Sequence, residues 1–333
     1  MSSNYGKNLK ITLFGEAKGR AVGVVIDGLQ PGVRIDFNAI DLELKRRKGG
    51  NPLTSPADET DVPMVLSGLE DGVTCGTPFC AALRTREDCA PDPEGGIPRE
   101  HDIYKGFNGL VSGGHLSARA AAGIVFAGAL CKQILKTRGI GIGAHVLSVG
   151  KVRGESFDKT DINPGMLQCL TTERIPLLDP YVREAMEEAV ADAARRRTSL
   201  GGVIEAAVIG LPAGLGEPFF DNTESVLSHL LFAIPSVKGV DFGGGFGLAE
   251  MDAHEIGGAA SNLSGGVEGG ISNGMPLICR AAFAPSLPDP GDPDADLSYD
   301  PCAVLRACPV VEAMLAIGVL DILYSKQAKT PAG

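Results

Sequence analysis

Tryptophan is absent from the 333-residue sequence, and aromatic residues make up only 5% of it. Basic tracts are also scarce, since the longest runs from Lys45 to Lys48 and the net charge is −11. Proteins that bind nucleic acids present aromatic stacking platforms or a basic face. The composition therefore disfavours a nucleic-acid partner. A small anionic substrate fits only if the few cations gather in one cleft.

No two cysteines have the Cys-x-x-Cys spacing, although the chain contains eight cysteines. A zinc site and a disulfide framework are therefore disfavoured, and reduced, mostly buried thiols are expected. No apolar run approaches the roughly 18–20 residues that a membrane span needs. Residues Met1 to Gly6 lack the basic and apolar pattern of a signal peptide. We expect a cytoplasmic protein without a membrane partner.

Hydrophobic periodicity predicts strands and helices that mix without a regular strand–helix–strand rhythm. Strands are predicted for residues 9–14, 22–26, 64–66, 74–83, 140–149, 203–211 and 276–283. Helices are predicted for residues 36–48, 116–136, 180–197, 222–232 and 309–325. The sequence has no internal repeat and no dinucleotide-binding fingerprint. The only linker-like segment is 285–297, which is rich in proline and aspartate.

A glycine-rich run, Gly-Gly-Val-Glu-Gly-Gly-Ile-Ser-Asn-Gly, occupies residues 265–274. It follows Ser261-Asn262 and precedes the predicted strand at 276–283. Glycine reaches positive φ without strain and permits close approach of another chain or a ligand. The plain interpretation is a set of turns and bulges between strands. The alternative is a cradle for a phosphate or a flat ring, which we favour for the run in its context.

Further blocks accompany this run in a fixed order. They occupy residues 14–28, 113–119, 125–135, 211–221, 234–239 and 300–314. Together with the glycine run, they resemble the chorismate synthase family over nearly the whole chain. The resemblance implies an α/β (α+β) fold with a single domain over residues 1–333. It also implies a β-α-β sandwich in which helices pack with a central antiparallel or mixed sheet core.

The resemblance also implies an activity. Chorismate synthases eliminate phosphate and a ring proton from 5-enolpyruvylshikimate 3-phosphate to give chorismate, the step that closes the shikimate pathway towards aromatic amino acids. They need reduced FMN and form homotetramers. A site for this reaction must hold a phosphate and two carboxylates and supply acid–base groups. Arginine forks suit such anions because they pair with them bidentately.

Matching the family's motifs to this sequence implies three groups of site residues. The catalytic candidates are Lys18, His101 and Asp300. The substrate-binding candidates are Arg46, Arg47, Arg99, Ser117 and Arg119. The cofactor-binding candidates are His115, Leu116, Ser117, Pro235, Ser236, Gly269, Ala284, Pro285, Ser286 and Ser298. No metal is implied.

Several of these positions also have a plainer interpretation from the residues alone. Arg46-Arg47 also fits a solvated basic end of a helix, and Ser117 fits a helix cap. His101 and His115 fit exposed histidines without a role in catalysis. Asp300 precedes a proline and fits an Asp-Pro turn. Both interpretations stay open at the level of the sequence.

The sequence departs from the family where the chemistry is expected. Lys18 replaces the histidine of the family's Gly-Glu-Ser-His-Gly block, and Ala57 replaces an arginine. Ala284 replaces a lysine and Ser298 an arginine. Each charge-assisted hydrogen bond to an anion is worth roughly 1.5–3 kcal/mol, so three lost cations predict weak FMN binding. Two functions follow: an active chorismate synthase, or a non-catalytic member that keeps fold and oligomer as an anion-binding, flavin-binding or interaction protein.

Overall fold

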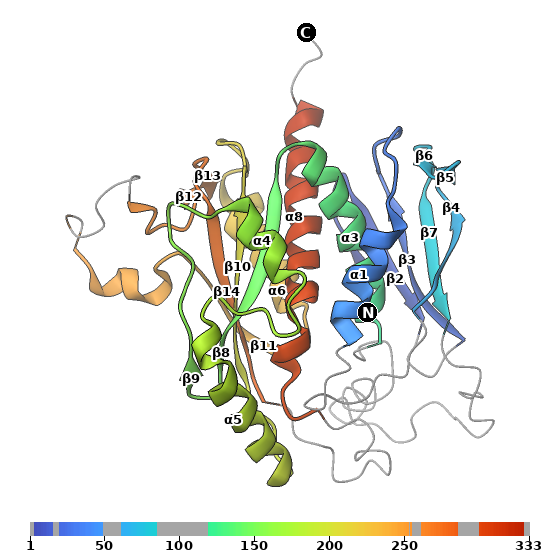
Figure 1. Cartoon of the computed structure of the whole chain (residues 1–333). Coiled ribbons are helices and arrows are strands. Elements are labelled where there is room, and N and C mark those ends of the chain that lie inside the picture. Colours follow the sequence, from blue (N-terminus) through green and yellow to red (C-terminus); the bar gives the residue numbers. More distant parts are fainter. Residues whose placement is uncertain are drawn as a thin grey trace, which may run out of the picture.

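Two five-stranded antiparallel sheets enclose a layer of helices (Figure 1). The computed structural model describes residues 3–15, 20–48, 61–84, 119–252, 254, 261–285 and 300–329. The expected β-α-β sandwich is confirmed. Its central layer, however, consists of helices, and the sheets lie on either side of it rather than forming a single central sheet.

The first sheet has the strand order β1-β2-β3-β7-β4. These strands are Asn4–Tyr5, Lys10–Gly15, Ala21–Asp27, Phe79–Arg84 and Pro63–Ser67. In β3, Val22, Val24 and Ile26 are buried in the core, as the period of two in a strand requires. A small hairpin of β5 (Leu69–Glu70) and β6 (Val73–Thr74) precedes β7.

The second sheet has the strand order β11-β14-β10-β8-β9. These strands are Val237–Phe242, Leu277–Phe283, Gly202–Ile209, Gly141–Val149 and Val152–Arg153. The long pairing between β8 and β10 has one register shift, between Val203 and Ile204. A separate hairpin joins β12 (Val267–Glu268) to β13 (Ile271–Ser272).

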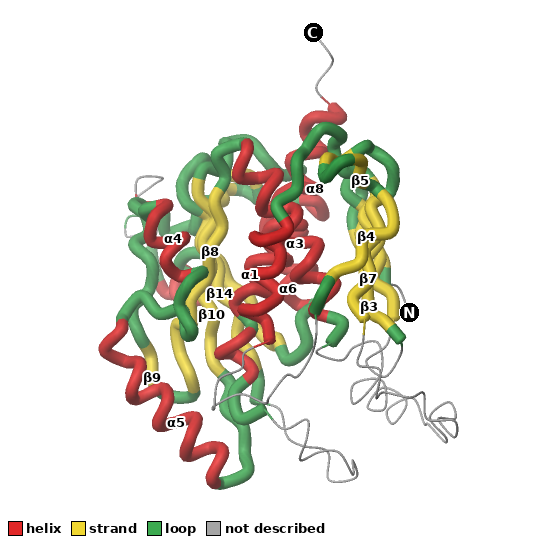
Figure 2. The backbone as a smooth tube through the Cα atoms, turned by 45° about the vertical axis from the view of Figure 1, so that its right-hand side comes forward, coloured by secondary structure: helices red, strands yellow, loops and turns green. Residues whose placement is uncertain are grey.

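In the part of the chain that the structure describes, the central layer contains the helices α1 (Phe37–Lys48), α3 (Ala121–Thr137), α6 (Thr223–Phe232) and α8 (Cys308–Lys329). Helices α4 (Pro164–Leu170) and α5 (Arg183–Arg195) lie outside this layer, beside β8 and β9 (Figure 2). Short 3₁₀ turns occupy 180–182, 219–221, 245–250 and 303–306.

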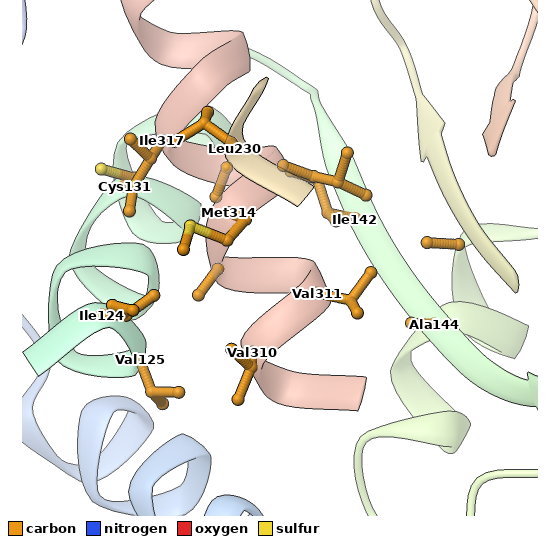
Figure 3. Packing of buried hydrophobic residues seen from close by; sticks show 14 of the residues in the cluster. Ile124, Val125, Cys131, Ile142, Ala144, Leu230, Val310, Val311, Met314 and Ile317 are labelled. Atoms are coloured by element: carbon orange, nitrogen blue, oxygen red, sulfur yellow. The ribbon is translucent and has the colours of Figure 1, made fainter. Parts of the chain in front are cut away.

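The core is built where α3 and α8 cross between the sheets. Figure 3 shows Ile124 and Val125 of α3, Met314 of α8 and Ile142 of β8 in this packing. The two helices approach so closely that a Cβ on Gly128 would lie 2.2 Å from the Cβ of Ala313. Buried residues from both sheets and the helices belong to one hydrophobic cluster. A single domain over residues 1–333 stays a prediction, which limited proteolysis would test.

Helix α8 corrects one expectation from the sequence. The segment Cys308–Ala328 is long and apolar enough to cross a membrane by composition alone, with a mean hydropathy of 1.7. In the fold, 89% of its apolar window is buried among the other elements. Such burial is what a core helix shows, and Glu312 and Asp321 interrupt its apolar surface.

Most predicted elements are confirmed, and one strand is wrong. The predicted strand at 74–83 is split into β6 and β7, because Gly76 adopts φ of +83° between them. Asp36 caps α1 as its residue type predicts: its Oδ1 accepts hydrogen bonds from the backbone of Asn38 at 2.9 Å and Ala39 at 3.4 Å. The predicted linker at 285–297 lies almost wholly outside the described residues.

Candidate functional site

A buried carboxylate joins two of the predicted substrate-binding arginines. Arg47, in the last turn of α1, donates from Nη2 to Asp61 Oδ2 at 2.8 Å. Arg119, just before α3, donates from Nη1 to Asp61 Oδ1. The side chains of Arg47, Asp61 and Arg119 are 5%, 2% and 6% exposed. The fold therefore brings the end of one helix and the start of another to a single anion.

The electrostatics of this cluster favour the charged form of Asp61. Burial opposes its ionisation, but Arg47 and Arg119 outweigh that effect and hold the pKa of Asp61 below its ordinary value. Lys48 Nζ lies 3.8 Å from Asp61 Oδ2, and Arg119 Nη2 also donates to the backbone oxygen of Arg84 at 2.8 Å. Three cations thus surround one carboxylate near the ends of α1 and α3.

Arg46 is also buried, but it pairs with a different carboxylate from Arg47. Its two terminal nitrogens each donate to a separate oxygen of Glu312 at 2.8 Å, and Nη1 also contacts Glu43 at 2.5 Å. Lys132 donates to Glu312 at 2.6 Å, and the backbone of Ala144 donates to it at 3.1 Å. The fork of Arg46 is thus engaged by a carboxylate of the core, which ties α1, α3, α8 and β8 together. A substrate contact by Arg46 remains a prediction.

Glu312 is fully buried, yet it is held as an anion. Desolvation raises its pKa, but Lys132 and Arg46 outweigh that effect and lower the pKa to about 2. The sequence analysis did not single out this residue. Its signal was a carboxylate in an otherwise apolar helix, since a buried charge in a core must be paired.

Four of the predicted cofactor residues lie at one corner of the second sheet. The backbone N–H of Ala284, after β14, donates to the carbonyl of Ser236, before β11, at 2.8 Å. Ser236 has φ of +71°, a conformation that is uncommon for a residue with a side chain. Pro235 and Pro285 are exposed on either side of this contact. The corner presents neutral and apolar groups.

Asp300 lies buried at the start of the segment that leads into α8. Its Oδ1 accepts a hydrogen bond from the backbone of Cys302 at 3.0 Å, which is the turn that the plain interpretation predicts. Its Oδ2 lies 2.7 Å from Nε of Arg306, an ion pair that lacks hydrogen-bond geometry. A catalytic role for Asp300 is still a prediction.

Gly269 lies apart from the other described cofactor candidates in the folded chain. It forms the turn between β12 and β13, with φ of +59°, before the start of β14, whereas Ala284 follows the end of that strand. The seven residues of β14 span ~23 Å. The side chain of Asn262 organises the glycine run by accepting from Gly266 at 2.7 Å and donating to the Pro276 carbonyl at 2.9 Å. The run therefore forms turns, as its plain interpretation predicts.

The other described candidates lie towards one end of the molecule. There α1 ends, α3 and α8 begin, and β14 ends beside the start of β11 (Figure 1). The remaining candidates lie outside the described residues: Lys18, Arg99, His101, His115, Leu116, Ser117, Ser286 and Ser298. Across the described ranges, no group of three His, Cys, Asp or Glu side chains is placed to hold a metal ion.

An open pocket of about 400 Å³ lies at the opposite end of the helical layer. Arg138 stacks over the ring of Tyr324 there, with its guanidinium carbon 5.5 Å from the ring centroid, and donates to Gln30 at 2.9 Å. None of the candidate site residues that the structure describes lines this pocket.

Comparison with known proteins agrees with this architecture. The family model for chorismate synthase matches residues 9–324. The chain belongs to the chorismate synthase family. A chorismate synthase of Thermococcus kodakarensis is 35% identical, covering 97% of this chain and 98% of the relative. A chorismate synthase of Synechocystis is 34% identical, covering 99% of each.

A solved structure shares the fold as well. A crystal structure of a chorismate synthase superposes with a TM-score of 0.77 at 27% identity, covering 97% of this chain and 93% of the other. The resemblance inferred from the motif order is therefore confirmed over nearly the full length of the chain. The family assignment supports an enzyme of the lyase class.

Proposed function

We propose that this protein is a chorismate synthase that acts on 5-enolpyruvylshikimate 3-phosphate with reduced FMN. The observation that supports this most strongly is the family match over nearly the whole chain, combined with Arg47 and Arg119 gathered by Asp61. Two buried guanidinium groups at a helix end and a helix start suit a substrate with a phosphate and two carboxylates. The comparisons give no support to the non-catalytic alternative.

In this proposal, cations bind the substrate and stabilise the negative charge that develops on its leaving phosphate. Arg47 and Arg119 bind substrate anions, and Lys18 stabilises the departing phosphate from the position of the family's histidine. His101 and Asp300 take part in acid–base steps as the ring proton leaves. Lysine has an unperturbed pKa of about 10.4, so Lys18 contributes charge rather than a proton near neutral pH.

The fit to FMN is partial. The described corner formed by Pro235, Ser236, Ala284 and Pro285 offers a neutral surface that suits the flat ring of a flavin. None of these four residues is a cation, and Ala284 stands where the family has lysine. Reduced FMN, when bound, supplies an electron-rich ring beside the substrate. We therefore propose that FMN binds, but weakly.

Chorismate formation by the purified protein, with reduced FMN under anaerobic conditions, tests this function. Lys18→Ala is expected to lower kcat by about ten-fold or more, since a charge-assisted contact to the leaving phosphate is lost. Lys10→Ala, on the exposed end of β2, is the matched control and should leave kcat unchanged. Equal turnover by Lys18→Ala and the parent would remove Lys18 from the mechanism.

An inactive parent protein would call for a second experiment. Lys18→His combined with Ala57→Arg, Ala284→Lys and Ser298→Arg restores the family's residues. Chorismate formation by this folded variant would show that substitution at the site silenced the parent. If it too were inactive, the non-catalytic alternative would be favoured.

We also propose that the protein acts as a homotetramer in the cytoplasm. Within the described residues, helices cover one face of the first sheet and none covers the other (Figure 1). Met64 and Leu66 on its edge strand β4 are 42% and 58% exposed. An apolar edge and an uncovered face suit contact with another copy. Light scattering coupled to size-exclusion chromatography tests the tetramer, and cell fractionation tests the location.

A further inference from the structure

Asp61 occupies an unusual position between two cations from distant parts of the chain. Each of its oxygens accepts from a different arginine: Oδ2 from Arg47 on α1 and Oδ1 from Arg119 beside α3. All three side chains are almost completely buried. Without the carboxylate, two guanidinium groups would meet in an interior where their repulsion is only weakly screened.

The position of Arg119 makes this cluster a suitable place for an anion. Arg119 lies two residues before the first residue of α3, a helix of 17 residues, where the helix dipole is positive. Arg47 lies at the end of α1, in a turn that also contains Lys45, Arg46 and Lys48. Arg119 also donates from Nη2 to the backbone carbonyl of Arg84 at 2.8 Å, so the Asp61 carboxylate and this carbonyl together fix the direction of its fork.

We propose that Asp61 is a positioning residue, whose carboxylate holds Arg47 and Arg119 together as one anion-binding pair. This inference rests on the proposed function, in which both arginines contact the substrate. Asp61 itself does not touch the substrate. Its carboxylate sets the direction of both forks, much as a second carboxylate orients a ligand in many binding sites.

Asp61 could instead neutralise the two arginines, and its removal would then change the affinity for an anion in the opposite direction. If Asp61 merely neutralised the arginines, its removal would free their charge and tighten anion binding. If it positions them, its removal lets the two cations separate and weakens binding. The sign of the change in affinity therefore decides between the two roles.

The test uses Asp61→Asn, which keeps the size of the side chain and removes its charge. We expect KM and the Kd for 5-enolpyruvylshikimate 3-phosphate to rise about ten-fold or more, and kcat to change less than about three-fold. Asp61→Glu restores the charge and should recover part of the affinity. Asp241→Asn is the matched control, because Asp241 pairs with Arg280 at 2.7 Å on the second sheet.

Thermal unfolding separates positioning from folding. A purely structural role would lower Tm and reduce kcat along with affinity, without rescue by glutamate. If Asp61→Asn does not fold, Asp61→Glu alone decides, since a longer side chain must displace a fork and raise KM. An unchanged or lowered KM in a folded Asp61→Asn or Asp61→Glu variant overturns the proposal.

Inorganic phosphate distinguishes this inference from the proposed function. If the parent neither binds nor converts the substrate, the function fails, and calorimetric titration with phosphate still tests the arginine pair. Weaker phosphate binding by folded Asp61→Asn than by the parent supports positioning. Equal binding by the two, or no phosphate binding by the parent, overturns it.

Discussion

Glu312→Gln is expected to destabilise the fold by about 3 kcal/mol at neutral pH. Its pKa falls from 4.5 to about 2 in the folded protein, and each pKa unit corresponds to about 1.36 kcal/mol. The ion pairs of Glu312 predict a similar loss of stability, because removing one partner of a buried ion pair costs roughly 3–5 kcal/mol. Glutamine would leave Arg46 and Lys132 in the core with only Glu43 as a charged partner.

The pH dependence follows from the direction of that shift. A carboxylate with a lowered pKa stabilises the fold above its unfolded pKa, and this stabilisation is lost as pH falls through the folded pKa. The difference between parent and Glu312→Gln should therefore be constant above about pH 5. At pH 3.5 it should be about 1.4 kcal/mol smaller than at pH 7.

Equilibrium urea unfolding at pH 7, 5 and 3.5, followed by circular dichroism, measures both quantities. Glu188→Gln on the exposed face of α5 is the control, and it should change stability by less than about 0.5 kcal/mol. A loss below about 1 kcal/mol for Glu312→Gln would refute the reasoning, because a buried, ionised partner of two cations must cost more. So would a difference that does not vary with pH.

Two further substitutions test the packing and the cofactor corner. Gly128→Ala should destabilise the fold by about 1–3 kcal/mol, because its Cβ would lie 2.2 Å from that of Ala313. Urea unfolding measures the loss, and Gly247→Ala is the control because the space around Gly247 is open. Ala284→Lys should tighten FMN binding about ten-fold or more by adding a cation for the flavin, as read from flavin fluorescence, while Ala233→Lys at the exposed end of α6 should not. A tight, stoichiometric FMN complex of the parent would contradict the weak binding from which this expectation starts.

Local patterns were sufficient to predict most of the secondary structure. Alternation predicted β8 closely, an apolar run predicted β10, and the cap at Asp36 predicted where α1 begins. The strand at 74–83 failed because the alternation of residues does not report the turn at Gly76. The placement of the helices between the sheets depends on tertiary packing, which a local pattern does not contain.

The glycine run shows a different limit of sequence reasoning. Its composition fits both a turn and a ligand cradle, since positive φ serves both. In the structure, the run forms the β12–β13 hairpin, and Asn262 bonds to the backbone of Gly266 before it and Pro276 after it. Gly269 therefore lies at the far end of β14 from Ala284. The order of motifs identified the family, but it did not show which residues lie together in space.

Arg46 and Arg47 show why the site could only partly be predicted. Successive residues on a helix point about 100° apart, so one arginine of the pair faces the core and the other faces Asp61. Both arginines lie in the basic last turn of α1, and nothing in the sequence distinguishes one from the other. The distinction arises from two carboxylates that arrive from elsewhere: Glu312, 266 residues away from Arg46, and Asp61, 14 residues away from Arg47. The buried acids, and not the arginines themselves, decide which cation ties the fold together and which is held beside Arg119 near the start of α3.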